Sequence, residues 1–182
     1  MQQFPIKAKD GQDFLLRLLN QQDAVSLGAF FVALSEASRS RFGPHPLSSE
    51  YARHLCEALA DDSAQRWVIA EGAAIVGYFI FERKILEPEY QRYYVQGVSL
   101  QAELDVILAP CIADDYQNAG LAMAAMQSLM TEFKRQGARS LVLMGGTQQS
   151  NHRARHFYQR CGFVEYGGFQ TDVYNIDMRL SL

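Results

Sequence analysis

The chain has 182 residues, of which 48% are hydrophobic and 20% charged, and a formal net charge of −3 at pH 7. These values are ordinary for a globular protein, so we expect a single domain over residues 1–182 that needs no disulfide or metal to fold. The negative charge and the lack of a basic cluster argue against nucleic acid as a partner, because phosphate contacts need a basic face.

The three cysteines, Cys56, Cys111 and Cys161, lie far apart and form no CxxC pair. This pattern is typical of reduced thiols in the cytoplasm and predicts no metal site. The N-terminal residues lack the regions of a signal peptide, and the longest apolar run, 73–81, is much shorter than the roughly 20 residues that cross a bilayer. We therefore expect a cytoplasmic protein that does not bind membranes.

Hydrophobic periodicity predicts the elements of the first half. Residues 12–19 are expected to form a strand or an extended entry segment, and 24–38 an amphipathic helix after Asp23. The segment SRSRFGPHPLSS (38–49) must be a loop, after which Ser49 can cap a second helix to about Leu59. Residues 66–70 and 73–85 are expected to pair as a hairpin around Glu71-Gly72.

The second half alternates strands and helices. The pattern favours no element over 86–100, but 102–109 is expected to be a strand that ends at Pro110. A helix from about Gly120 to Gln136 follows, with Gly137 as its left-handed cap. Residues 140–146 are expected to form a buried strand, 151–161 a helix, and 163–168 with 171–180 a final hairpin. This order predicts a mixed α/β domain with one parallel pair of strands.

The segment DDYQNAGLA (114–122) lies between a strand and a helix. Gly120 allows a ligand to approach the backbone closely, and small residues leave the helix start uncrowded. The unpaired N–H groups and partial positive charge of a helix start bind anions such as pyrophosphate. Taken alone, the segment also fits an ordinary helix start that is rich in small residues.

Two motifs in the right order resemble the GNAT superfamily of acetyl-CoA-dependent N-acetyltransferases. The first is Gln117-x-x-Gly120-x-Ala122, and the second is Asn151-x-x-Ala154-x-x-Phe157-Tyr158-x-x-x-Gly162-Phe163. The resemblance covers roughly residues 65–180. It implies a GNAT-like α/β fold, with a mostly antiparallel twisted sheet of six to seven strands, one central parallel pair and about four helices.

The resemblance also implies acetyl-CoA as co-substrate and an amine of a small molecule or peptide as acceptor, with no metal. The family holds the pantetheine arm between two central parallel strands and the pyrophosphate at the loop. The residues that this places at the cofactor are Ile107, Leu108, Ala109, Gln117, Asn118, Ala119, Gly120, Leu121, Ala122, Asn151, Ala154 and Phe157. The chain departs from the common loop at Asn118 and Ala119, where glycine and a basic residue are frequent, so we expect one phosphate contact to be lost.

Transfer of an acetyl group to an amine needs a proton for the departing thiolate. Tyr158 matches the family tyrosine that serves as general acid, and a phenol, which titrates near pH 10, is protonated at neutral pH. The alternative is that Tyr158 only packs, because it shares a helical stripe with Ala154, Phe157 and Cys161. Asn151 is expected to cap its helix or to bind the pantetheine.

The amine must lose a proton before it attacks. Glu103 and Asp105 are the candidate bases, since acidic residues on this strand often serve so in related enzymes; the alternative is that both are surface carboxylates at a strand end. Cys111 lies close enough to the loop to suggest an acyl-cysteine intermediate, but direct attack is the family's usual route. His152 and His156 are expected to be solvated.

The acceptor is expected to bind at variable parts of the chain, among them the loop with Arg39, Arg41 and His45. These side chains could recognise an anionic group, or they could be a solvated turn held by its prolines. The aromatic segment 86–100 would suit a homodimer contact. Two other functions stay open, a non-catalytic acyl-CoA-binding module and a transferase for a longer acyl group.

Overall fold

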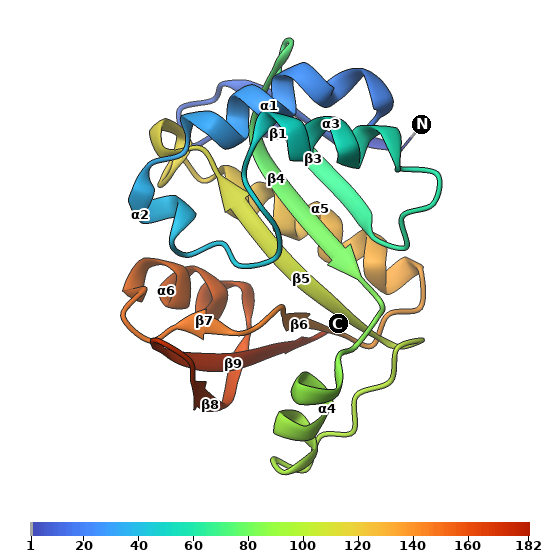
Figure 1. The fold of residues 1–182 in the computed structure, drawn as a ribbon, viewed down its shortest axis with the longest axis vertical. Helices are drawn as coiled ribbons and strands as arrows, with labels where there is room; N and C mark the ends of the chain where they lie inside the picture. Colours follow the sequence, from blue (N-terminus) through green and yellow to red (C-terminus); the bar gives the residue numbers. More distant parts are fainter. Residues whose placement is uncertain (1) are drawn as a thin grey trace. The chain divides into compact units, whose positions relative to one another are not determined.

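The computed structural model describes residues 2–182, and its helices and strands are drawn in Figure 1. Nine strands form one sheet in the order β1-β2-β3-β4-β5-β6-β9-β7, with β8 paired to β9. The expected mixed α/β fold is confirmed, with nine strands rather than six or seven. The chain divides into two compact units, Met1–Ile80 with Ala109–Ser128, and Phe81–Leu108 with Leu129–Leu182. That the whole chain forms a single domain stays a prediction.

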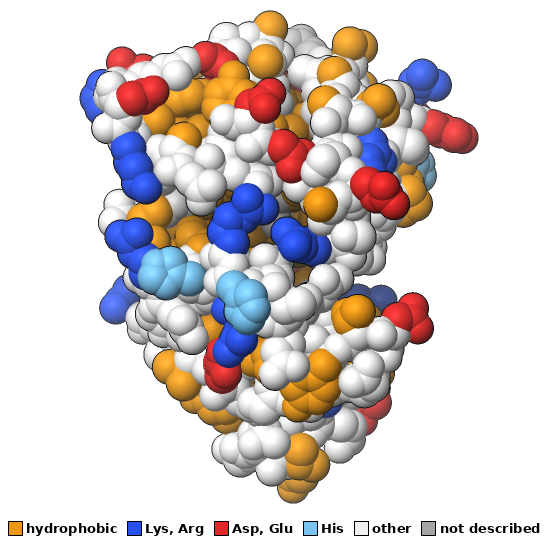
Figure 2. Space-filling view, turned by 90° about the vertical axis from the view of Figure 1, so that its left-hand side faces the viewer, with side chains coloured by type: hydrophobic (Ala, Val, Ile, Leu, Met, Phe, Trp, Pro, Cys, Tyr) orange, Lys and Arg blue, Asp and Glu red, His pale blue; other side chains and the backbone are white. Residues whose placement is uncertain are grey.

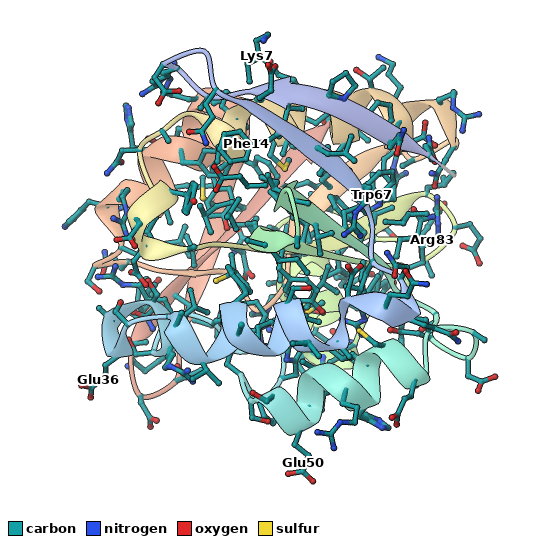
Figure 3. The ribbon with its side chains drawn as sticks, turned by 90° about the horizontal axis from the view of Figure 1, so that it is seen from above. Lys7, Phe14, Glu36, Glu50, Trp67 and Arg83 are labelled. Atoms are coloured by element: carbon teal, nitrogen blue, oxygen red, sulfur yellow. The ribbon has the colours of Figure 1, made fainter. Side chains whose placement is uncertain are left out.

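The first unit begins with three antiparallel strands, β1 (Gln3–Lys7), β2 (Asp13–Leu18) and β3 (Gln65–Glu71). Phe4 of β1 stacks on the buried Trp67 of β3 with ring centroids 5.7 Å apart. Figure 3 shows Lys7 at the outer end of β1. The sequence predicts β2 and β3 but not β1, because Pro5 interrupts a short run that only an edge strand can accommodate.

A tight turn at Gly72-Ala73 joins β3 to β4 (Ala74–Glu82), which enters the second unit with its last residues. Gly72 has a φ of +57°, which glycine adopts without strain. The predicted hairpin is confirmed, with the turn one residue later than expected.

The helices of the first unit are η1 (Gln21–Asp23), α1 (Ala24–Ala33), α2 (Glu36–Arg39) and α3 (Ser49–Glu57). The helix expected over 24–38 is broken at Leu34, where ψ is 135°, and Ser35 caps α2 by accepting from Ser38 N. The residue that caps α3 is Ser48 rather than Ser49. α1 and α3 lie side by side, and Figure 3 shows Glu36 and Glu50 pointing outward from the first turns of α2 and α3.

The second unit contains the parallel pair. β5 (Asp105–Ile112) pairs with β6 (Ser140–Leu143) from Asp105↔Ser140 to Leu108↔Leu143. β9 (Tyr174–Ser181) is antiparallel to β6 and also pairs with β8 (Val164–Gln170) and the two-residue β7 (Thr147–Gln148). The parallel pair and the final hairpin are therefore confirmed.

The expected strand over 102–109 is shifted. Residues 102–104 form a turn, and β5 continues through Pro110. Leu108 O accepts from Met144 N, which is the last hydrogen bond between β5 and β6. Because alternate residues of β5 direct their backbone groups toward β6, Pro110 would be the next residue to do so. Pro110 has no N–H, but β6 has already ended at that point. A proline is tolerated there because no hydrogen bond is lost.

Three more helices complete the chain, α4 (Glu87–Tyr94), α5 (Leu121–Arg135) and α6 (His152–Cys161). α5 and α6 were predicted, and both are followed by glycines with positive φ, Gly137 (+82°) and Gly162 (+97°). α4 was not predicted. Its Tyr93 is buried in a cluster with Leu100, Ile107 and Val142.

Candidate functional site

The connection from β5 to α5 is a short loop with an unusual backbone. It contains the 3-10 turn η2 (Asp114–Tyr116) and two residues with positive φ, Asn118 (+66°) and Gly120 (+86°). Among residues 2–182, Asn118 is the one non-glycine residue with positive φ. Asparagine tolerates this conformation better than most residues do, which explains why it can stand at a position where glycine is common.

Asp114 fixes the loop to the turn before α2. Its carboxylate accepts from Ser35 N and Ser35 Oγ, both at 2.8 Å, and from Ser38 Oγ at 2.7 Å. The side chain of Gln117 also points into the loop, since its Nε2 donates to Ile112 O at 3.1 Å and to Ser38 Oγ at 3.2 Å. These contacts give Gln117 a role in shaping the loop, which the sequence motif alone did not reveal.

The amide groups at the start of α5 are free to bind a ligand. The N–H groups of residues 118–122 have no hydrogen-bond acceptor within residues 2–182, whereas Ala124 N, in the first turn of α5, donates to Gly120 O. Leu121 is fully buried, so its side chain anchors the helix start in the core. Five consecutive free donors at the positive end of a helix dipole form a strong site for an anion.

A lysine from the β1–β2 turn contacts this loop. Lys9 N donates to Ala119 O at 2.8 Å, and Lys9 Nζ donates to Asn118 O at 3.1 Å. Its stem passes over Gly120, where an added Cβ would lie 2.9 Å from Lys9 Cγ. Sequence reasoning missed Lys9, because no local pattern connects positions 9 and 120.

The thiol of Cys111 is poorly suited to nucleophilic attack. Burial raises the pKa of Cys111 to about 12, and the nearby Asp114 raises it further. The thiol therefore stays protonated at neutral pH, whereas attack requires the thiolate. This supports direct attack by the amine over an acyl-cysteine intermediate.

Asp105, one of the two expected bases, is fully buried and fully bonded. One carboxylate oxygen accepts from Ser140 Oγ at 2.5 Å, and the other accepts from Gln101 N at 2.8 Å. Arg139 binds the same carboxylate, and Arg179 lies 3.5 Å from it. Burial would raise the pKa of Asp105, but the hydrogen bonds from Arg139 and Ser140 outweigh it and hold the pKa below its ordinary value. These contacts favour a structural role at the start of the parallel pair.

Glu103, the other expected base, is exposed and lies in the turn before β5 rather than in the strand. Its carbonyl oxygen accepts from Arg83 at 2.6 Å. The two carboxylates therefore do not share one face of a strand, because that strand begins only at Asp105.

The carboxyl end of the parallel pair carries a different acid. Ile107 and Leu108 are buried there, and Met144 N closes the ladder on Leu108 O at 2.8 Å. The next amide, Gly145 N, donates to Glu89 Oε1 at 2.8 Å, and Glu89 is only 6% exposed. Sequence reasoning missed Glu89 because it lies on the unpredicted α4, although Pro88 in the first turn is a signal for a helix start.

The second motif forms α6. Asn151 Oδ1 accepts from Ala154 N at 3.2 Å, so Asn151 caps the helix as expected. Tyr158 is buried, and its ring packs against Phe157 and Phe163 with centroids 5.2 and 5.4 Å away. Ala154 and Phe157 are half-buried. The packing expected of Tyr158 is therefore present, and its acid role stays a prediction.

The opposite side of α6 is polar. The exposed side chains of this helix include His152, Arg153, His156 and Arg160. Figure 2 shows histidine side chains beside basic side chains on the face turned toward the viewer. Their exposure agrees with the solvated histidines expected from the sequence.

The loop with Arg39 and His45 is not a solvated turn. The Arg39 guanidinium donates to the carbonyl oxygens of Phe31, Leu34 and Leu47 at 2.5 to 2.9 Å. His45 stacks on Tyr51 with centroids 4.7 Å apart. Both side chains thus stabilise the loop through contacts within the chain. Arg41, in contrast, is exposed.

The bonding of His45 assigns its tautomer. Nδ1 lies 2.8 Å from Pro46 O, which can only accept, so Nδ1 carries the hydrogen and Nε2 accepts from the Tyr78 hydroxyl at 3.2 Å. Burial lowers the pKa of His45 to about 4, so this ring is neutral at pH 7.

Residues 2–182 contain no group of three or more His, Cys, Asp or Glu side chains that could hold a metal ion. Over the same residues, no helix combines the length and the apolar character required to span a membrane.

Known structures share this fold. The GNAT domain of S. lividans PAT superposes with a TM-score of 0.78 at 16% identity, covering 99% of this chain and 97% of that one. The ribosomal-protein-S5-alanine acetyltransferase from Vibrio fischeri gives 0.73 at 14% identity, with 100% and 97% covered. AAC(6')-Ib, solved in complex with Parmomycin and acetyl-CoA, gives 0.70 at 16% identity, with 92% and 93% covered.

At these identities the superpositions establish the fold alone. No curated protein matches the sequence. Residues 31–163, however, match the Acetyltransferase (GNAT) family, a span that includes the β5–α5 loop and all of α6. The chain therefore belongs to the GNAT family of acetyltransferases.

Proposed function

We propose that this protein transfers the acetyl group of acetyl-CoA to a primary amine of a small molecule or peptide. The observation that carries the proposal is the row of five amides at residues 118–122 that lack an acceptor within residues 2–182. A pyrophosphate offers the charge and the acceptor oxygens that such donors require. The complex of AAC(6')-Ib with acetyl-CoA, a structure similar to this one, supports the same choice of ligand.

The proposed roles of the other cofactor residues follow from their positions. In the first unit, Asn118, Ala119, Gly120, Leu121 and Ala122 bind the pyrophosphate through their amides, while Gln117 holds the loop. In the second unit, Ile107 and Leu108 bind the pantetheine arm at the end of the parallel pair, and Asn151, Ala154 and Phe157 contribute from α6. Ala109 of β5, which belongs to the first unit, is a further proposed cofactor residue.

In the proposed reaction the amine nitrogen attacks the thioester carbonyl, and a tetrahedral intermediate collapses with loss of the thiolate of CoA. Tyr158 donates its phenolic proton to that sulfur, and such a general acid contributes typically 100-fold or more. The amine gives up a proton to solvent water during attack. Neither Asp105, whose oxygens are occupied, nor the exposed Glu103 is assigned to accept it.

The proposal is tested by incubating the purified protein with acetyl-CoA and each member of a panel of amines and peptides. The release of the CoA thiol is then measured. Tyr158→Phe should lower kcat about 100-fold while the Kd for CoA changes less than about twofold. Tyr94→Phe, the same change at an exposed tyrosine of α4, should leave both values unchanged. An unaltered kcat in Tyr158→Phe would refute the acid role.

A non-catalytic acyl-CoA-binding module is the second candidate, and the bonded state of Asp105 favours it, because an expected base is missing. Tight CoA binding without thiol release for any acceptor would select the module. Faster turnover with butyryl-CoA than with acetyl-CoA would instead identify a transferase for a longer acyl group. Failure to bind CoA would exclude all three functions.

A further inference from the structure

We infer that Lys9 is a positioning residue for the cofactor, and that it takes the place of the basic residue missing from the β5–α5 loop. The inference rests on the proposed function, since it concerns how the loop binds the pyrophosphate of CoA. Lys9 lies in the turn after β1, more than one hundred residues before the loop that it contacts.

Lys9 contacts two neighbouring carbonyl groups of the loop. Lys9 N binds Ala119 O, and Lys9 Nζ binds Asn118 O. In a trans peptide the N–H points opposite to the C=O of the same unit, and no peptide bond within residues 2–182 is cis. The N–H groups of Ala119 and Gly120 therefore point away from Lys9. One residue thus fixes the direction of two of the five free donors, one through its side chain and one through its main-chain N–H.

This fixing matters because the glycine of the loop can adopt backbone conformations that other residues rarely adopt. Asn118 and Gly120 both have positive φ, and glycine moves readily between positive and negative values. Without a partner for the carbonyls, the intervening peptides could rotate and turn their N–H groups away from an anion. Donors that are oriented before the ligand arrives bind it more tightly than donors that must be ordered on binding.

The charge of Lys9 is also available. Lys7, Arg17 and Arg66 of the same unit each form an ion pair with an aspartate. Lys9, in contrast, has no carboxylate partner within residues 2–182 and binds only a carbonyl oxygen. Its full positive charge therefore adds to the positive end of the α5 dipole, as a basic residue within the loop would.

The contact with Lys9, together with the positive φ, explains why residue 120 is a glycine. A Cβ on residue 120 would lie only 2.9 Å from Lys9 Cγ, which is too close for the two atoms to stay in place. A larger residue would displace the lysine as well as strain the backbone. The glycine of the motif and a lysine outside it thus depend on each other.

Isothermal titration with CoA and with 3′-dephospho-CoA tests the inference in wild type and three variants. Lys9→Met keeps the stem and the main-chain hydrogen bond but removes the ammonium, and Lys9→Arg keeps the charge. Lys7→Met removes the same charge two residues away, from a side chain that is 66% exposed. Melting temperatures without ligand verify that all four proteins are folded.

We expect Lys9→Met to raise the Kd of both ligands by the same factor, about tenfold. This factor corresponds to the loss of one charged hydrogen bond. Lys7→Met should match wild type, and Lys9→Arg should stay within about threefold of it. Wild-type affinity in Lys9→Met would overturn the inference, as would an equal loss in Lys7→Met. A loss seen with CoA but not with 3′-dephospho-CoA would place Lys9 at the ribose phosphate instead. If wild type binds neither ligand, the proposed function itself fails.

Discussion

Replacing Asp105 with asparagine separates a structural carboxylate from a catalytic one. Asp105 has no exposed surface and binds Arg139, Ser140 and Gln101 N. An asparagine keeps one acceptor but turns an NH₂ group toward guanidinium donors. Removal of one partner from a buried ion pair costs about 3 to 5 kcal/mol. Because the Arg139 side chain is 42% exposed and can recover solvent contacts, we expect the lower end, about 3 kcal/mol.

Urea unfolding measures this loss. It can be followed by far-UV circular dichroism and by the fluorescence of the single tryptophan, Trp67, which is buried in the first unit. A loss of about 3 kcal/mol corresponds to a fall of roughly 6 to 12 °C in Tm for a chain of this size. Glu103→Gln is the matched control, and we expect it to change the free energy of unfolding by less than about 0.5 kcal/mol, because Glu103 is exposed.

The pH dependence gives a second test of the same carboxylate. The pKa of Asp105 is lower in the folded protein than in the unfolded chain, so its stabilisation is complete above the unfolded value, near 4, and is lost as pH falls through the folded value. The difference between wild type and Asp105→Asn should therefore be constant from pH 8 to 5 and shrink below pH 4. Wild-type stability in Asp105→Asn, combined with loss of thiol release, would refute the structural role and restore Asp105 as the base.

Two further predictions concern local structure. Because the pKa of His45 is about 4 and that of an unfolded histidine is near 6.5, the unfolded chain binds the extra proton first, and stability should fall as pH drops from 6.5 to 4. The free energy of unfolding should change by at most about 1.4 kcal/mol per pH unit. In His45→Gln, urea unfolding should show a smaller change over the same pH range. An unchanged pH dependence in this variant would contradict a neutral His45 ring. Asn151→Ala should cost about 1 kcal/mol because Ala154 N loses its acceptor, and Asn151→Ser should restore most of it. An equal loss in both Asn151 variants, measured in the same way, would argue against capping.

Two helices of the second half could be predicted because their signals are local. α5 and α6 show helical periodicity, and Gly137 and Gly162 stand where left-handed caps are required. The break of the first helix at Leu34 was missed, although Ser35 has the side chain of a cap. That cap competes with a continuous apolar stripe, and the bonds from Ser35 to Asp114 decide the outcome.

The roles of the acidic residues could not be predicted, because their partners are distant in sequence. Asp105 binds arginines 34 and 74 positions away, and Glu89 binds an amide 56 positions away. A carboxylate on a strand looks the same in the sequence whether it faces water, a substrate or a buried guanidinium. Its function is determined by tertiary contacts, and for Asp105 these contacts replaced an expected surface position with a buried ion pair.

The cofactor motif combines two kinds of residue that a sequence pattern does not distinguish. Gln117 and Leu121 direct their side chains into the fold, where they hold the loop and anchor the helix. Asn118 and Ala119 present their amides, for which the identity of the side chain matters mainly through the backbone angles it allows. A basic side chain can therefore be lost from the loop without loss of the anion site, provided that a residue such as Lys9 supplies its charge from elsewhere. The departure of this chain from the common motif is thus better explained as a relocated cation than as a weakened site.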